Sequence, residues 1–96
     1  MKASFHTFGC KLNFAETSTI ARELARRGVE RAAEGEVPDL CVVNTCSVTE
    51  TADKKCRQLI HRLARQYPGA AIAVTGCYAQ LKAKEIATFP NVAVVA

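Results

Sequence analysis

Three cysteines in this chain each follow a short segment typical of a β-strand and precede a helical pattern. Cys10, Cys46 and Cys77 close the stretches TFGC, VNTC and VTGC. Because the carboxyl ends of parallel strands meet at one edge of a sheet, we expect the three thiols to gather there. The N-terminal ends of the following helices would favour the thiolate form, which binds soft metals. The pattern predicts a metal site with one coordination position left open.

The identity of the metal stays open between iron–sulfur and zinc at this point. Iron–sulfur clusters are usually held by cysteine thiolates. The three cysteines are far apart in the sequence, unlike the paired C-x₂-C ligands typical of structural zinc. Two interpretations without a metal also remain: small cysteines buried in loops, and a thiol redox protein. The redox interpretation is weakened because the sequence contains no C-x-x-C.

The other two cysteines fall on predicted core positions. Cys41 lies inside the apolar run 40–43, well before the end of that strand, and Cys56 lies in the apolar stripe of a helix. Both are expected to fill the core. His6, in the middle of the first strand, is expected to be structural. The sequence offers no glycine-rich phosphate loop, Ser-His-Asp arrangement or carboxylate pair as a competing site.

Length and composition favour one small globular domain. The chain has 96 residues, of which 49% are hydrophobic and 23% are charged, and its five cysteines do not suit a fully paired disulfide framework. No apolar run is long enough to span a membrane, and the chain begins without an apolar secretory signal, which predicts a cytoplasmic protein with reduced thiols. A net charge of +4 permits a polyanionic partner.

Strand-like runs alternate with amphipathic helical patterns along the chain. Strands are expected at 4–8, 29–32, 40–43, 70–74 and 92–95. We expect the first helix to begin with a capping box at Asn13 and Glu16 and to end at Gly28, with its buried stripe formed by Phe14, Thr17, Ile20, Ala21 and Leu24. The segment between residues 34 and 39 is expected to be an acidic surface loop, and residues 81–89 a short helical stretch.

The second helix has an apolar and a basic face. It is expected to begin with a capping box at Ser47 and Glu50 and to end at Tyr67, with its buried stripe formed by Ala52, Cys56, Leu59, Ile60, Leu63 and Tyr67. The outer face carries Lys54, Arg57, His61 and Arg65. Such a face is usually only solvated, and contact of Lys54, Arg57 and Arg65 with RNA is the alternative.

This order of elements predicts the fold class. Strands that alternate with helices indicate an α/β, three-layer sandwich on a mostly parallel sheet of about five strands. Right-handed crossovers then favour a flavodoxin-like or Rossmann-like arrangement, in which ligands bind beyond the carboxyl ends of the strands. A non-catalytic binding module that uses this same edge is the alternative function from the fold alone.

The three cysteine motifs resemble those of a known family. "TFGCKLNFAETS", "VVNTCSVTETADKK" and "VTGCYAQ" are similar to the motifs of the N-terminal domain of the methylthiotransferases, radical S-adenosylmethionine enzymes that modify tRNA or a ribosomal protein. Lys11 and Leu12 after the first cysteine are most similar to the branch that acts on threonylcarbamoyladenosine beside the tRNA anticodon. The isopentenyladenosine branch usually has Gln-Met there, and the ribosomal-protein branch usually has proline.

The resemblance implies that Cys10, Cys46 and Cys77 bind an auxiliary [4Fe–4S] cluster, whose open iron takes the sulfur or methylthio group to be inserted. Other positions that match the motifs and would shape the pocket are Asn13, Asn44, Thr45 and Gln80. The sequence has no C-x₃-C-x₂-C, so S-adenosylmethionine and a second [4Fe–4S] cluster are expected in a radical-SAM domain outside this chain. Residues 1–96 would then be one N-terminal domain, inactive alone, that meets tRNA together with a further RNA-binding domain.

Overall fold

Five parallel strands form one sheet in the computed structural model of the chain, which describes residues 1–8, 11–46 and 50–95. The strands are β1 (Lys2–Thr7), β2 (Glu30–Arg31), β3 (Leu40–Thr45), β4 (Ala71–Gly76) and β5 (Val92–Val95). Their spatial order is β2-β1-β3-β4-β5, and every pairing is parallel. The predicted α/β class with its parallel sheet is confirmed, as is the short edge strand at β2.

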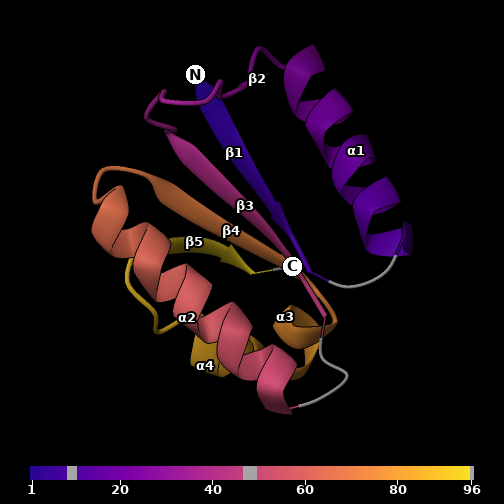
Figure 1. Cartoon of the computed structure of the whole chain (residues 1–96), viewed down its shortest axis with the longest axis vertical. Helices are drawn as coiled ribbons and strands as arrows, with labels where there is room; N and C mark the ends of the chain where they lie inside the picture. Colours follow the sequence, from indigo (N-terminus) through magenta and orange to yellow (C-terminus); the bar gives the residue numbers. More distant parts are fainter. Residues whose placement is uncertain (9–10, 47–49, 96) are drawn as a thin grey trace.

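Within the described ranges, four helices cover the two faces of this sheet. They are α1 (Lys11–Arg26), α2 (Glu50–Gln66), α3 (Cys77–Leu81) and α4 (Ala83–Ile86). In Figure 1, α1 lies on one side of the strands, and α2, α3 and α4 lie on the other. The chain moves from β1 to β2 in one direction and from β3 to β5 in the opposite direction. Right-handed crossovers therefore place α1 on the opposite face from the later helices, and the strand order reverses between β1 and β3.

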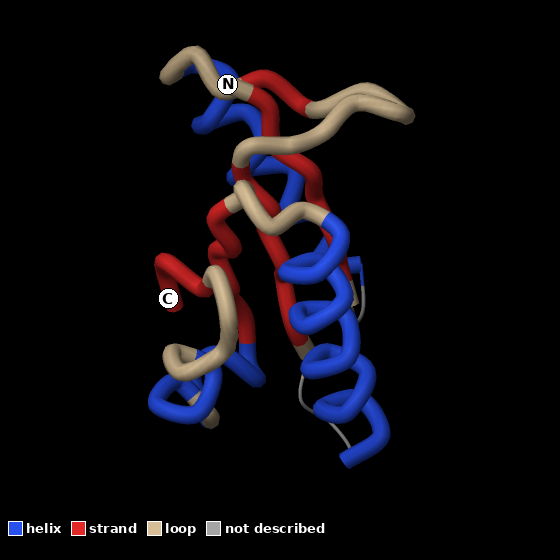
Figure 2. Tube along the Cα trace, turned by 90° about the vertical axis from the view of Figure 1, so that its left-hand side faces the viewer, coloured by secondary structure: helices blue, strands red, loops and turns tan. Residues whose placement is uncertain are grey.

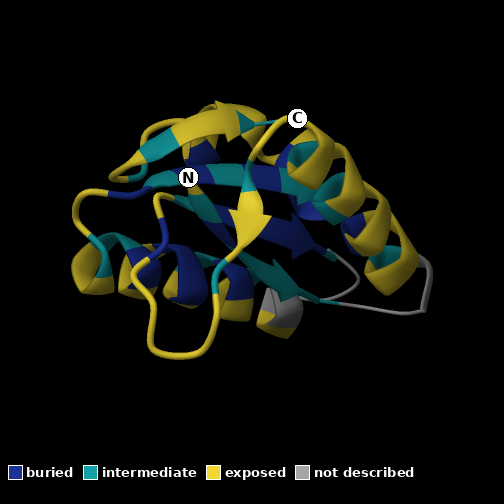
Figure 3. Cartoon of the chain, turned by 90° about the horizontal axis from the view of Figure 1, so that it is seen from above, coloured by how far each residue is buried: buried dark blue, intermediate teal, exposed yellow. Residues whose placement is uncertain are grey.

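The main core lies between the sheet and α2. Alternate residues of β3 and β4 point to this face, where the largest buried cluster contains Cys41, Val43, Cys56, Leu59, Ile60, Leu63, Ala70, Ile72, Val74, Tyr78, Ala79 and Ile86. The predicted core positions of Cys41 and Cys56 are confirmed, because both side chains are fully buried. Figure 3 shows the buried inner side of α2, whereas most of α1 is exposed.

Helix α1 differs from its predicted pattern at its N-terminal end. It begins at Lys11, so Asn13 lies inside the helix, and the predicted capping box is wrong. The predicted burial of Phe14 is also wrong, because its side chain is 57% exposed. The polar residues Asn13 and Thr17 take the face toward the sheet, and one helical step turns Phe14 about 100° away from it. The predicted end is confirmed, since α1 ends at Arg26 and Gly28 has a φ of +87°.

The segment after β4 forms two short helices instead of the predicted single helix at 81–89. Helix α3 starts at Cys77 directly after β4. Lys82 has non-helical backbone angles, φ −124° and ψ 31°, and separates α3 from α4. The chain therefore turns into a helix at the cysteine itself, without an intervening loop. Helix α2 ends at Gln66, close to the predicted end, and begins at Glu50, while Ser47, the predicted cap, lies outside the described residues. No helix in the described ranges is both long and apolar enough to cross a bilayer.

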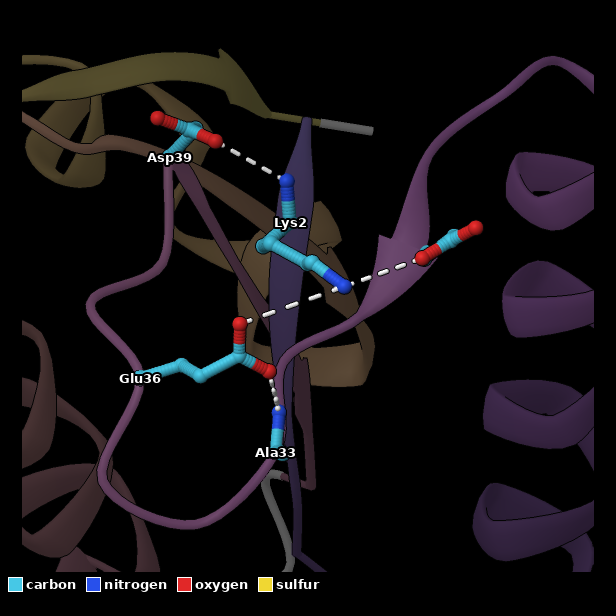
Figure 4. A network of polar contacts seen from close by, with 5 residues as sticks. Lys2, Ala33, Glu36 and Asp39 are labelled. Carbon is cyan, nitrogen blue, oxygen red and sulfur yellow. Dashed lines mark hydrogen bonds and ion pairs between the residues drawn. The ribbon is translucent and has the colours of Figure 1, made fainter.

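Ion pairs and hydrogen bonds connect the acidic loop before β3 to the start of β1. The Lys2 ammonium lies 2.9 Å from a Glu30 carboxylate oxygen and 3.9 Å from one of Glu36 (Figure 4). The Lys2 backbone N–H donates to Asp39 over 2.9 Å, and the Ala33 N–H donates to Glu36 over 2.7 Å. These contacts are exposed and each stabilises the fold only slightly. They confirm a surface loop and place its carboxylates at the amino ends of the strands.

Candidate metal centre at the carboxyl edge of the sheet

Two of the predicted ligands leave neighbouring strands at the same level of the sheet. Thr45 at the end of β3 pairs with Gly76 at the end of β4, and Cys46 and Cys77 are the next residues. Adjacent strands lie about 4.8 Å apart, so the two residues leave the sheet side by side. Both thiols are free; Cys77 is exposed and Cys46 is partly exposed. The arrangement suits a soft metal or metal cluster that approaches these thiols from outside the core.

The third predicted ligand, Cys10, lies outside the described residues. The strand that leads to it runs beside β3, with Thr7 paired to Asn44. The Phe8 N–H donates to the Asn44 carbonyl over 2.8 Å, and Cys10 follows Phe8 by two positions in the sequence. Figure 2 shows these strands running together toward the end where α2 begins. Among residues 1–8, 11–46 and 50–95, no three His, Cys, Asp or Glu side chains form a group that could hold a metal.

Gly76 allows β4 to pass close against β3 immediately before Cys77. Its φ is +97°, a value that L side chains rarely adopt. A Cβ at this position would overlap the Thr45 carbonyl oxygen and would lie 2.8 Å from both the Thr45 nitrogen and Asn44 Oδ1. The two strand ends can therefore approach this closely only with glycine at position 76.

Asn44 joins α1 to the sheet just below the cysteine edge. Its side chain is fully buried. Its Nδ2 donates to the Asn13 carbonyl over 2.9 Å and to Thr17 Oγ1 over 3.2 Å. Its Oδ1 accepts from Asn13 Nδ2 over 3.2 Å. All polar atoms of the buried amide thus have partners, which fixes the side-chain orientation.

Threonine hydroxyls extend this network to β1, β4 and α3. Thr45 Oγ1 donates to the Thr75 carbonyl over 2.6 Å and accepts from the Ala79 N–H at 3.3 Å. On the other face, the Thr7 and Thr17 hydroxyls lie 2.8 Å apart. The motif residues Asn44 and Thr45, with Asn13, therefore position the strand ends. Gln80, the fourth matched position, is exposed on α3.

The sequence patterns do not indicate a role for Thr7, Thr17 or Gly76 at this site. Thr17 lies in the predicted buried stripe of α1, where a hydroxyl needs a hydrogen-bond partner, and this need is the one signal for it in the sequence. The contact of Gly76 with Thr45 depends on the strand register, which the sequence alone does not provide.

Cys41 and Cys56 differ from the edge cysteines in their surroundings. Burial raises the pKa of both thiols above the ordinary value. Cys56 Sγ lies 4.0 Å from the Cys46 carbonyl oxygen, a weak contact that opposes this rise. The neutral thiol is therefore favoured at both core positions, whereas metal binding needs the thiolate.

Tyr78, directly after Cys77, is fully buried between α3 and the core. Its hydroxyl has no hydrogen bond of ordinary geometry within the part of the chain that the structure describes. Burial raises the pKa of Tyr78, and the nearby Arg57 guanidinium opposes this rise. His6 is half-buried and lies 3.1 Å from the Ser4 hydroxyl, as expected for a structural histidine.

A family model described as "Uncharacterized protein family UPF0004" matches residues 2–96. The chain belongs to this family. The match covers the strands, the helices and all three cysteine motifs.

Relatives of this UPF0004 chain include curated tRNA methylthiotransferases. It is 48% identical over 92 residues, or 96% of the chain, to "Threonylcarbamoyladenosine tRNA methylthiotransferase MtaB" of Bacillus subtilis. It is 36% identical over 95 residues, or 99% of the chain, to the Aquifex aeolicus protein of the same name. It is 42% identical over 91 residues, or 93% of the chain, to "tRNA-2-methylthio-N(6)-dimethylallyladenosine synthase" of Novosphingobium aromaticivorans.

The resemblance to the methylthiotransferase family is confirmed by these matches. The UPF0004 chain covers 20%, 23% and 20% of the three relatives, so it spans about a fifth of their length.

Proposed function

We propose that residues 1–96 form the N-terminal, cluster-binding domain of a tRNA methylthiotransferase that acts on threonylcarbamoyladenosine next to the anticodon. The pairing of Thr45 with Gly76 carries this proposal, because it brings Cys46 and Cys77 out of the sheet together. The names of the Bacillus subtilis and Aquifex aeolicus relatives support the reaction and its substrate.

The proposed cofactor is an auxiliary [4Fe–4S] cluster held by Cys10, Cys46 and Cys77. The donor set fits such a group, since the two described thiols are accessible at the sheet edge while Cys41 and Cys56 are enclosed in the core. When bound, the cluster would supply an iron with a free coordination position for sulfur or a methylthio group. The protein's part is to hold the strand ends rigidly through the uncharged Asn44 and Thr45 contacts.

The remaining chemistry belongs to segments outside residues 1–96. The chain covers about a fifth of its relatives and has no C-x₃-C-x₂-C, which supports a separate radical-SAM domain. That domain would bind S-adenosylmethionine and a second [4Fe–4S] cluster, and a further domain would bind the tRNA. The proposed enzyme works in the cytoplasm, where tRNA is found, and this domain alone is inactive.

The proposal predicts the modified nucleoside in cells. The full-length enzyme that contains this chain is expressed in a bacterial strain lacking its own tRNA methylthiotransferases. We expect methylthiolated threonylcarbamoyladenosine in tRNA digests analysed by mass spectrometry, and none from Cys77→Ala, which loses a ligand. Cys56→Ala, which removes a core thiol, serves as the matched control and should keep the product.

Two results would contradict this function. Continued product formation by Cys77→Ala would show that the edge thiol is dispensable. Methylthiolation of dimethylallyladenosine instead would assign the enzyme to the branch of the Novosphingobium aromaticivorans relative.

A further inference from the structure

A hollow of about 630 Å³ lies beside the carboxyl end of β1, between this strand and α2. Its wall on the strand side is formed by His6, Thr7 and Phe8. Its wall on the helix side is formed by Lys55, Gln58, Leu59, Arg62 and Arg65. Because α2 packs over β3 and β4, its flank leaves this part of β1 open.

The charges in this hollow all have one sign. Lys55, Arg62 and Arg65 are exposed, and no aspartate or glutamate belongs to the lining. Within the described residues, none of these three cations is in an ion pair. Burial and then the charge of Arg62 lower the pKa of His6, which is therefore neutral at physiological pH. The three cations are thus available to an external anion.

Two other charged regions of the described surface do not share this feature, although a smaller hollow lined by Arg22 and Arg31 also has cations and no carboxylate. A second hollow of about 510 Å³, on the other flank of α2, contains both signs of charge: Thr51, Asp53, Lys54, Arg57, Lys82 and Glu85. Glu30, Glu36 and Asp39 lie at the opposite end of β1, where they contact Lys2 (Figure 4). Of the three cations expected to contact RNA, Arg65 lines the cationic hollow, whereas Lys54 and Arg57 line the mixed one.

We propose that the cationic hollow binds the phosphate backbone of RNA, an inference that rests on the proposed function for its choice of polyanion. Guanidinium groups bind phosphate oxygens in bidentate fashion, and lysine adds a point charge. The cations from Lys55 to Arg65 extend about 15 Å along α2, which is long enough to contact more than one phosphate.

The position of the hollow connects it to the cysteine edge. Phe8 in its wall donates its N–H to the carbonyl of Asn44, and Cys46 follows Asn44 by two positions. An RNA strand in the hollow therefore passes beside the edge where Cys46 and Cys77 leave the sheet. The hollow is a binding surface that brings the nucleotide strand to the proposed cluster site.

The test measures binding of a synthetic tRNA anticodon stem–loop to the metal-free chain across a salt series. Each phosphate contact with single-stranded RNA contributes about −0.7 to the slope of log K against log salt. The triple variant Lys55→Gln, Arg62→Gln and Arg65→Gln should therefore reduce the slope by about 2. Between about 50 and 200 mM salt, the native chain should lose about 20-fold more affinity than this variant.

The matched control is Arg22→Gln, Arg27→Gln and Lys84→Gln, three exposed cations outside the hollow. Both triple variants lower the formal net charge from +4 to +1, and the control should keep the native slope. All six side chains are exposed, so thermal unfolding should match the native chain. An equal decrease of the salt slope in both triple variants, or no binding of the stem–loop at low salt, would each overturn the proposal. Because no metal is present, these results are independent of cluster binding.

Discussion

Replacing Gly76 by alanine is expected to destabilise the chain by about 2–6 kcal/mol, since a strained φ and a steric overlap each cost about 1–3 kcal/mol. The added Cβ would meet the backbone of Thr45 and the side chain of Asn44, which cannot move without breaking the pairing of β3 with β4. A chain of this size is stable by only about 5–14 kcal/mol, so the loss is a large fraction of the total. Urea unfolding of the apo chain measures it.

Alanine substitutions at two other glycines distinguish the stability cost of the positive φ from the cost of the steric overlap. Gly35 has a φ of +85° with open space around it, so Gly35→Ala should cost about 1–2 kcal/mol for the conformation alone. Gly69 has open space and no positive φ, and Gly69→Ala should change stability by less than about 1 kcal/mol. If Gly76→Ala cost no more than Gly35→Ala, the close approach of the two strand ends would be disproved.

Replacing Asn44 by aspartate should destabilise the chain by about 3 kcal/mol or more at neutral pH, because it buries a carboxylate. The change turns the donor that faces the Asn13 carbonyl at 2.9 Å into an acceptor. The side chains that contact Asn44, those of Asn13 and Thr17, carry no charge that could compensate.

This loss of stability should depend on pH. In the unfolded chain the introduced carboxyl ionises near its ordinary pKa of about 4, whereas burial raises its pKa in the folded chain. The folded state then binds more protons between these two values, so the free energy of unfolding falls as pH rises above about 4 and levels off above the raised pKa.

The control for this prediction is Asn91→Asp, the same chemical change at an exposed residue that donates to the Pro68 carbonyl over 3.1 Å. Water can replace that bond, so we expect a small loss of stability with no added pH dependence between pH 5 and 8, which lie above the ordinary carboxyl pKa of about 4. Urea unfolding across this pH range compares the two variants. Equal behaviour of both would show that Asn44 is not a buried support of the site.

The parallel sheet, and the distinction between cysteines in the core and cysteines at strand ends, were predictable from the sequence. Apolar runs covered on both faces predicted β3 and β4, and the position of Cys41 inside such a run predicted its burial. The same logic placed Cys46 and Cys77 at strand ends. Hydrophobic periodicity carries this information because strands and helices bury their apolar residues at different spacings.

The polar support of the site was not predictable in the same way. Local patterns predict Asn13 as a helix cap because asparagine is favoured there, but its amide donates hydrogen bonds to Asn44 and Thr45, more than 30 positions away. Hydrogen bonds to residues distant in the sequence thus take the place of the expected local capping bond. Phe14 became exposed for the same reason, since Asn13 and Thr17 occupy the inner face of α1. The overlap at Gly76 depends on the register of β3 with β4, which only the folded chain defines.

Iron content after anaerobic reconstitution tests the central claim, that Cys10, Cys46 and Cys77 together hold one cluster. The native chain should bind about four irons, as one [4Fe–4S] cluster requires. Cys10→Ala, Cys46→Ala and Cys77→Ala should each lose this iron, whereas Cys56→Ala should keep it because its thiol lies in the core. Iron binding by Cys46→Ala equal to that of the native chain would contradict the account.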